Sequence, residues 1–513
     1  MIDLAKFDAP LFSEAYRRLL NDIAAISEPD ATYHAAAPPG LRERIVRCIW
    51  FDQTLATDRL RTDDGQKLRV ISPGWWNLES GPDFRNAAVR IGSGPVVKGD
   101  IEVHLQANLW KGHGHHTDPA YNGVVLHVTL WSNSAPPTIT TAAGGTVPQL
   151  TLEPYLTTPI AELSDSVDPA EYPEASDASS GRCHELLVEG KVTIEWLAHF
   201  LDHAGDQRIA DKARRLAARD ADDDQLLYEA IAEGLGYKRN KAPAAELARR
   251  LPLATLRDRV AQLADDVPKA AAVEALLFGV AGLLDNSFQG LDEAARDYAA
   301  SLRDQWDRLA GDLAEAALDR AQWSFDSTRP VNFPTRRVAA LACLVARHLD
   351  QGLGQGLRQA LGPTDQGRLA PRDMTRRRAQ LLDVFMSLAH PFWSTRSQFK
   401  GKPMARPVRL VGTDRAHTIV INGVLPALLY RARREADRPS EELLHQLYAA
   451  YPKLPSTSVT RFMAMRLFGR PEKELKTLRS ARRQQGLYQL YTDFCDSDKL
   501  TCKQCPLVRL LES

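Results

Sequence analysis

The spacing of apolar residues changes near residue 180 and divides the chain into two kinds of structure. Before that point, short apolar runs are separated by Gly, Pro and Asn. Two of them, DIEVHL and HVTLW, alternate apolar with polar side chains, as half-buried strands do. The pattern predicts strands at 67–72, 87–92, 100–105, 124–131 and 148–153, preceded by a helix, LRERIVRCIWF.

From Cys183 onward, long segments rich in Ala, Leu and Arg carry apolar residues at helical spacing, and strand patterns nearly vanish. We therefore expect an α+β protein with a mixed-sheet domain followed by a large helical domain. The predicted parts are a helix and arm, an α/β domain, a linker rich in Asp, Ser and Pro, the helical domain and a cysteine-rich tail, at 1–40, 41–163, 164–181, 182–490 and 491–513.

Composition excludes a disordered or collagen-like chain, because 44% of the 513 residues are hydrophobic and 25% are charged. No apolar run reaches the ~18 residues of a membrane span, and the N-terminus lacks the basic start and apolar core of a signal peptide. The six cysteines are sparse, so we expect free thiols rather than disulfides, in a cytoplasmic protein.

Charge is distributed unevenly along the chain, although 65 basic residues balance 65 acidic ones. Residues 1–330 contain 34 basic and 50 acidic residues, a net of −16, whereas 331–513 contain 31 and 15, a net of +16. Either the C-terminal part presents a basic surface to a polyanion, or the two parts neutralise each other within the fold.

The densest group of chemically active side chains lies between residues 77 and 131, which hold five of the thirteen histidines. In DIEVHL, strand alternation places Glu102 and His104 on one face and apolar residues on the other. Asp83 follows a Gly-Pro turn and begins the preceding strand, so we expect it beside Glu102.

Pro82-Asp83 and Glu102-x-His104 resemble the PD-(D/E)XK nuclease core, in which a hairpin presents Pro-Asp and Glu-x-Lys to one metal ion. The resemblance implies a phosphodiesterase in which Asp83 and Glu102 bind Mg²⁺ or Mn²⁺ and His104 assists the water or the phosphate. Here His replaces Lys, and a neutral imidazole can itself bind metal. Further ligands or supporting groups would be His113, His115, Asp118 and His127.

Two other interpretations of this region remain open. Zinc could be bound by His104, by His113 or His115 and by a carboxylate, which would make the protein a zinc-dependent hydrolase. Alternatively, the polar groups cross-link a sheet edge and the HGHH loop through hydrogen bonds. The protein would then be a non-catalytic nucleic-acid-binding scaffold with a degenerate nuclease fold.

A second candidate metal site lies at the C-terminus, where three cysteines follow the pattern C-x6-C-x2-C, namely Cys495, Cys502 and Cys505. Thiolates so closely spaced are good metal ligands. The pattern resembles the iron–sulfur loop of endonuclease-III-like DNA glycosylases, although Leu511 stands where that loop has its fourth cysteine. We predict a [4Fe–4S] cluster or Zn²⁺, with Cys183 as fourth ligand or His184 as an alternative.

Arginine clusters in the C-terminal part could neutralise the phosphates of a nucleic acid. The alternative is that they lie on solvated helix faces beside acidic partners. The candidate residues are Arg376, Arg377, Arg378, Arg433, Arg434, Arg482 and Arg483.

Taken in order, the motifs GPDF, GDIEVH, KGHGH, RPVNFPTRR, INGVLPALLY, QQGLYQLYTDFC and CKQCPL resemble a bacterial family of unknown function, DUF2851. The resemblance runs from about Ile45 to Leu507. It implies that the histidine region and the cysteine tail belong to one architecture, but it implies no activity. The leading hypothesis from the residues is therefore a nucleic-acid-acting, metal-dependent phosphodiesterase.

Overall fold

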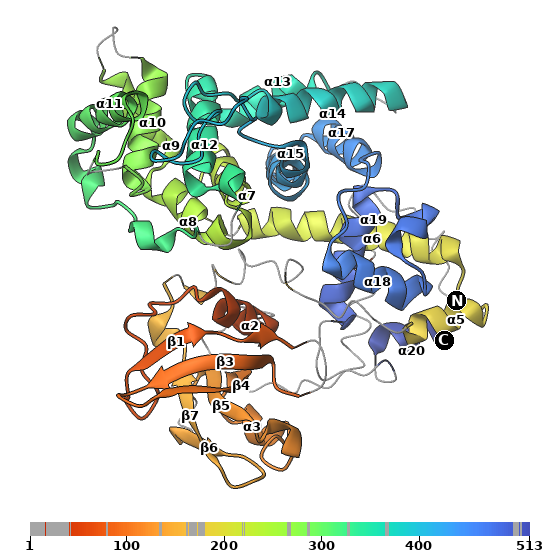
Figure 1. Ribbon diagram of the computed structural model, residues 1–513. Helices are drawn as coiled ribbons and strands as arrows, with labels where there is room; N and C mark the ends of the chain where they lie inside the picture. The colour runs from red at the N-terminus through yellow and green to blue at the C-terminus, as the bar shows by residue number, and fades with distance from the viewer. Residues whose placement is uncertain are drawn as a thin grey trace. The chain divides into compact units, whose positions relative to one another are not determined.

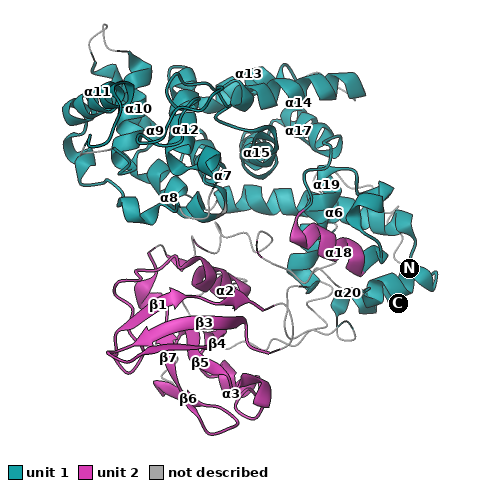
Figure 2. Ribbon diagram, viewed as in Figure 1, with its two compact units in different colours: residues 1–27, 180–456, 467–513 teal, residues 28–179, 457–466 magenta. Residues whose placement is uncertain are grey.

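The computed structural model describes residues 16, 41, 43–77, 81–132, 136–157, 159–160, 163, 172, 180–217, 219, 221–263, 268–284, 288–325, 329–364, 369–495, 502 and 505–512. Two compact units make up the chain (Figure 2). The sheet unit comprises residues 28–179 and 457–466, and the helical unit comprises 1–27, 180–456 and 467–513. Most of the predicted arm (1–40) and linker (164–181) lies outside the described residues.

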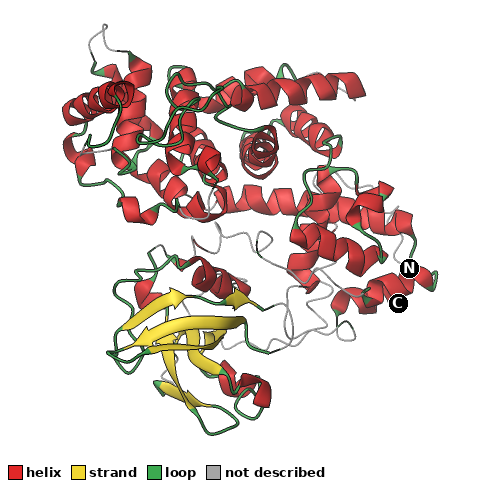
Figure 3. Ribbon diagram, in the orientation of Figure 1, coloured by secondary structure: helices red, strands yellow, loops and turns green. Residues whose placement is uncertain are grey.

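The described residues of the sheet unit form a mixed sheet of seven strands (Figures 1 and 3). Its strands lie in the order β1-β3-β4-β5-β7-β6, with β2 paired to β3. The pairs β4–β5 and β5–β7 are parallel, and the other pairs are antiparallel. The bounds are β1 Leu68–Ser72, β2 Trp75–Trp76, β3 Phe84–Ile91, β4 Val96–Gln106, β5 Val124–Trp131, β6 Thr138–Thr140 and β7 Thr146–Thr151.

The five predicted strands are all present, and β5 has the predicted bounds. The alternation of side chains along the central strands separates two faces of the sheet. On one face, Ile101 and Val103 of β4 pack with Ile49 and Trp50 of helix α2 (Glu43–Asp52) in a continuous apolar core. The opposite face carries the buried polar side chains of the same strands, among them His104.

A short helix, α3 (Leu109–Gly112), belongs to the crossover between the parallel strands β4 and β5. Its buried Trp110 packs with Val124 and Val147, and the indole Nε1 donates a hydrogen bond to the Thr140 carbonyl at 3.1 Å. This anchor fixes the crossover against β6, so the residues that follow α3 are held close to the sheet.

The hairpin of β3 and β4 contains a bulge close to Asp83. The pairing changes from Phe84↔Ile101 to Ala87↔Gly99, so two residues of β3 oppose one of β4. Asn86 lies in the left-handed region with φ 54°, and its N–H donates to the Asp100 carboxylate at 3.2 Å. Bulges bend a strand and redirect the side chains beside them.

The helical unit is built from long helices, as the apolar spacing predicts, with its apolar core between them (Figure 3). Short π-helical turns occur at Val420–Val424 and Tyr491–Cys495. No helix of the described residues is both long and apolar enough to cross a membrane. After residue 180 the helices are α5 Arg182–Val188, α6 Ile194–Ala217, α7 Asp223–Leu235, α8 Tyr237–Arg250, α9 Leu253–Ala261, α10 Lys269–Val280, α11 Glu293–Leu309, α12 Pro334–His348, α13 Leu353–Leu361, α14 Pro371–Met386, α15 Thr413–Ile419, α16 Leu425–Arg434, α17 Arg438–Ala449, α18 Ser458–Phe468, α19 Ala481–Leu490 and α20 Pro506–Glu512.

Candidate metal centre

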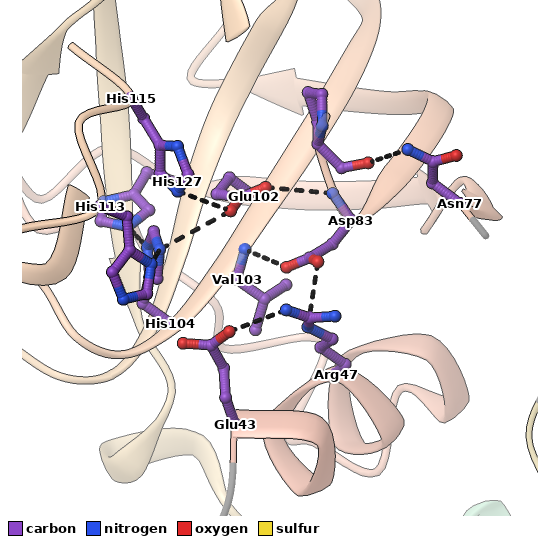
Figure 4. Close-up of polar contacts among 11 residues, drawn as sticks. Glu43, Arg47, Asn77, Asp83, Glu102, Val103, His104, His113, His115 and His127 are labelled. Carbon is purple, nitrogen blue, oxygen red and sulfur yellow. Dashed lines mark hydrogen bonds and ion pairs between the residues drawn. The ribbon is translucent and has the colours of Figure 1, made fainter. Parts of the chain in front are cut away.

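Three histidines of the sheet unit meet on the polar face of the sheet (Figure 4). One nitrogen of each of His104, His113 and His115 lies within 4.8 Å of the other two, and the described residues contain no other group of three potential ligands this close. His104 belongs to β4, whereas His113 and His115 belong to the crossover that follows. The cluster therefore combines one rigid strand position with two positions at the end of a helix.

The way α3 ends explains why a glycine stands between His113 and His115. Gly114 has φ +78°, its N–H donates to the Lys111 carbonyl at 3.0 Å, and the N–H of His115 donates to the Trp110 carbonyl at 3.1 Å. These are the two hydrogen bonds of a Schellman motif, which requires a left-handed residue and favours glycine there. The turn places the imidazoles of His113 and His115 on the two sides of Gly114, with ring centroids 5.5 Å apart.

The spacing of the ligand atoms suits tetrahedral coordination. His104 Nε2 lies 3.1 Å from His113 Nδ1, and Glu102 Oε1 lies 3.1 Å from His115 Nε2 and 3.6 Å from His104 Nε2. Bonds of ~2.0–2.1 Å to zinc would put the corners of a tetrahedron about 3.3 Å apart. These three separations are thus close to those of metal ligands, and one nitrogen of each histidine lies within 4.8 Å of the other two.

Burial lowers the pKa of three of these imidazoles, those of His104, His115 and His127. Burial, and then the neighbouring imidazoles, keep the pKa of His104 well below its usual value. Burial also lowers the pKa of His115, and it lowers the pKa of His127 to about 4 against the opposing effect of the hydrogen bond to Gln149. Neutral imidazole is the form that binds metal, so the cluster needs little proton release to accept an ion.

Glu102 is fixed by the β3–β4 hairpin. Its Oε2 accepts a hydrogen bond from the Asp83 N–H at 3.0 Å, which leaves Oε1 directed at the histidines (Figure 4). Glu102 is nearly fully buried. A carboxylate held in this way can either bind the ion or take a proton from water bound to it.

Asp83 lies beside Glu102, as the sequence predicts, but its carboxylate has other partners. Oδ2 accepts from the Val103 N–H at 2.9 Å, and Oδ1 lies 3.0 Å from Nε of Arg47 on α2. Arg47 also contacts Glu43 at 2.8 Å (Figure 4). Both oxygens are therefore occupied, so the geometry favours histidine ligation over a cation shared by Asp83 and Glu102.

Of the other predicted supporting residues, His127 lies next to His104, with their ring nitrogens 2.8 Å apart. Asp118 is exposed and its carboxylate accepts the Ala120 N–H at 2.9 Å, which caps the short helix Pro119–Tyr121. The structure thus gives Asp118 a local role in the crossover.

Sequence reasoning missed several residues that complete the site. Arg47 and Glu43 stand on α2 at the i, i+4 spacing of a helix ion pair. Tyr121 stacks on His115 with ring centroids 3.8 Å apart, and burial, then Glu102, raise the pKa of its phenol. Gln149 of β7 accepts a hydrogen bond from His127. Only the Glu43–Arg47 spacing is a signal that the sequence itself carries.

The cysteines lie in the helical unit, where α5 packs against α20 (Figure 1). Cys183 is the second residue of α5 and Cys505 directly precedes α20; both are buried. Arg182 and Glu512 form an ion pair at 3.0 Å between the same two helices. Residues 496–501 and 503–504 lie outside the described residues, so the metal site of Cys183, Cys495, Cys502 and Cys505 stays a prediction.

The candidate nucleic-acid-binding arginines mostly have partners within the helical unit. Arg377 is buried and donates to the carbonyls of Leu361 and Pro363 at 2.6 and 2.7 Å. The guanidinium of Arg378 lies 5.8 Å from the centre of the Tyr451 ring. The remaining five pair with carboxylates: Arg376 with Asp373, Arg433 with Glu441, Arg434 with Asp223, Arg482 with Asp206 and Arg483 with Asp202.

Comparison with known proteins places the chain in one family. No curated protein and no solved structure gives a significant match. The model of the family described as "Protein of unknown function (DUF2851)" matches residues 43–454, about four-fifths of the chain. The match includes the whole histidine cluster and most of the helical unit. The chain therefore belongs to the DUF2851 family.

Proposed function

We propose that this protein is a metal-dependent hydrolase whose transition-metal ion, zinc being the best fit, is held by His104, His113 and His115. The observation that carries the proposal is the convergence of three imidazoles, with one nitrogen of each within 4.8 Å of the other two, on the polar face of the sheet. Three protein ligands leave a fourth position open, as in catalytic zinc sites, whereas structural zinc sites have four.

Glu102 has the position of a general base in this site. Its Oε1 borders two of the three ligand nitrogens, at 3.1 and 3.6 Å, so a water in the fourth position would lie within its reach. The ion would lower the pKa of that water and polarise the scissile bond. Glu102 would take the proton and then return it to the leaving group. The Asp83 N–H keeps the carboxylate in place throughout.

A phosphodiesterase that uses Mg²⁺ or Mn²⁺ at Asp83 and Glu102 is the second candidate. It is supported by the β3–β4 hairpin, which brings these residues together through the 3.0 Å contact of the Asp83 N–H with Glu102. Arg47 neutralises Asp83 and would have to release it before a cation could bind. The second candidate therefore needs a rearrangement that the first does not.

The first test is metal content followed by hydrolysis. Purified protein is expected to contain a transition metal that depends on the cluster, and chelation should abolish hydrolysis of p-nitrophenyl esters or bis(p-nitrophenyl) phosphate until zinc is restored. His113→Ala should lose this ion. Glu102→Gln should keep it while hydrolysis falls ~10²–10⁴-fold, the usual contribution of a general base.

His116→Ala is the matched control, because His116 lies in the same loop but is exposed and outside the cluster. It should keep both the ion and the activity, as should Cys505→Ser. A His113→Ala protein with unchanged metal content would refute the site. Plasmid nicking that requires Mg²⁺, disappears in Asp83→Asn and is unchanged in His113→Ala would establish the second candidate instead.

A further inference from the structure

A chain of buried hydrogen bonds crosses three neighbouring strands and ends at the metal centre. His104 Nδ1 lies 2.8 Å from His127 Nε2, and His127 Nδ1 lies 2.7 Å from Gln149 Oε1. The three residues belong to β4, β5 and β7, and each is fully buried. His127 and Gln149 are register partners in the parallel β5–β7 pair. Because the strands are fixed by their own pairing, the chain of side chains has little freedom to rearrange.

The direction of each hydrogen bond follows from the far end of this chain. Gln149 Nε2 contacts the Pro136 carbonyl, which can only accept, so the amide nitrogen is the donor there and Oε1 faces His127. His127 Nδ1 must then carry a proton. His127 is fully buried, and its ring nitrogens contact the Gln149 amide oxygen and the His104 ring rather than a carboxylate. A buried imidazolium with no neighbouring anion is costly, so His127 is neutral and its Nε2 is a bare acceptor. The proton between the two histidines consequently belongs to His104 Nδ1.

We propose that Gln149 is a positioning residue that acts through His127 to hold His104 as the Nδ1–H tautomer, with the Nε2 lone pair directed into the metal site. The role in metal binding rests on the proposed function, whereas the tautomer itself does not. In the metal-free protein this lone pair accepts a hydrogen bond from His113 Nδ1, 3.1 Å away. His104 is thus set as a ligand before the ion arrives and releases no proton on binding it.

The tautomer can be measured in the metal-free wild type. Two-bond ¹H–¹⁵N correlation spectra of ¹⁵N-histidine-labelled protein distinguish protonated ring nitrogens from bare ones, and His104→Gln identifies the His104 signals. We expect His104 protonated at Nδ1 and bare at Nε2, and His127 likewise. His104 protonated at Nε2 in the folded wild type would overturn the proposal, whatever metal the protein binds.

Variants of Gln149 then test the effect on the ion. Gln149→Met has a similar volume but no hydrogen-bond acceptor for His127. It should raise the dissociation constant for Zn²⁺ by ~10–100-fold, the usual effect of removing a hydrogen-bond partner of a metal ligand. The constant is measured against a competing chelator. Unchanged zinc affinity in Gln149→Met would also overturn the proposal.

Thr129→Val controls for packing. Thr129 of β5 is the register partner of His104 and is fully buried, and its hydroxyl has no hydrogen-bond partner among the described residues. The variant should therefore leave the tautomer and the zinc affinity unchanged. Failure of the wild type to bind Zn²⁺ would refute the metal-dependent function. The spectra of the metal-free protein would still decide the tautomer, so the two failures can be told apart.

Discussion

Single buried charges in this protein are held by several partners at once, and Asp206 on α6 is a clear case. Its carboxylate accepts two hydrogen bonds from the guanidinium of Arg482, and His445 Nε2 lies 3.5 Å away. Burial alone would raise the pKa of Asp206, but these partners outweigh it and hold the pKa below its usual value. Removing one partner would leave the other charge buried without compensation.

Acid should therefore weaken the helical unit through Asp206. Its pKa is lower in the folded than in the unfolded chain, so the stabilisation is present above the unfolded pKa of ~3.9 and is lost as pH falls through the folded value. At neutral pH, Asp206→Asn should cost ~3–5 kcal/mol. Below pH ~4 the difference from wild type should shrink, as measured by circular dichroism melts across the pH range.

Asp304→Asn is the matched control for this pH profile. Asp304 also pairs with an arginine, Arg308, but both side chains are more than half exposed. Exposed pairs contribute ~0–1 kcal/mol, so this variant should melt almost as the wild type does. If the difference in stability between the wild type and Asp206→Asn stays constant from neutral to acid pH, the pKa of Asp206 is not lowered.

At the same residue scale, the sequence predicts which polar groups line the site but not how they are bound. Alternation in DIEVHL correctly places Glu102 and His104 on the face opposite the core. It carries no information about Arg47 or Gln149, because their positions depend on pairing across strands and on the packing of α2. The local sequence thus shows which side chains share the face of the site. The ion pair of Asp83 with Arg47 depends on tertiary packing and cannot be predicted from it.

Helices α6 and α19 approach each other closely because each has a glycine at the contact. A Cβ on Gly205 of α6 would lie 2.1 Å from the Arg482 carbonyl oxygen, and one on Gly486 of α19 would lie 2.2 Å from the Leu201 carbonyl oxygen. A side chain at either position would therefore push the backbone of the other helix away. The two glycines therefore set the distance between the helices that carry Asp206 and Arg482.

Gly486→Ala tests this contact. Alanine favours an isolated helix by ~1 kcal/mol over glycine, yet here the clash should destabilise the helical unit by ~1–3 kcal/mol, as overpacking does. Gly112→Ala in α3 is the control, since Gly112 is exposed and its Cβ would meet only Leu109 Cδ2 at 3.9 Å. In urea titrations, the unfolding midpoint of Gly486→Ala should fall and that of Gly112→Ala should rise. An equally stable Gly486→Ala protein would show that α19 can shift freely.

Whole elements were predictable where the apolar pattern is long and regular. The strand 124–131 and the change to helices after residue 180 are both confirmed. Strands β2 and β6 have only two and three residues, too few for any alternation to be recognised. The end of α3 shows the same limit, because His-Gly-His reveals a Schellman turn only once the helix before it is known.

At the scale of the whole molecule, some charges of the acidic part of the sequence pair with charges of the basic part. Within the helical unit, Asp202, Asp206 and Asp223 from before residue 330 pair with Arg483, Arg482 and Arg434 from after it. These three arginines therefore form ion pairs within the helical unit. By contrast, Lys402, Arg406 and Arg409 are exposed and form no ion pair among the described residues.

The two groups of cations should behave differently when removed. Replacing Arg482 and Arg483 with Gln should lower the melting temperature and leave any affinity for a fluorescein-labelled DNA duplex unchanged. Replacing Lys402, Arg406 and Arg409 with Gln should leave stability unchanged. If the wild type binds the duplex, this second variant should bind it with lower affinity. The slope of log affinity against log salt concentration should fall in magnitude by ~0.9 for each phosphate contact that is lost. A stable but binding-deficient Arg482/Arg483 variant would reverse the assignment.

The crossover between β4 and β5 has a consequence for how the candidate site assembles. Glu102 and the three candidate ligands, His104, His113 and His115, lie within one contiguous stretch that ends before β5. Closing a loop of about ten residues takes ~10–100 ns and costs little chain entropy. The coordinating groups can therefore come together as soon as these two strands pair, and the cooperativity of the helical unit has no part in that step. We therefore expect melting of the helices and loss of the candidate site to be separable transitions of one chain.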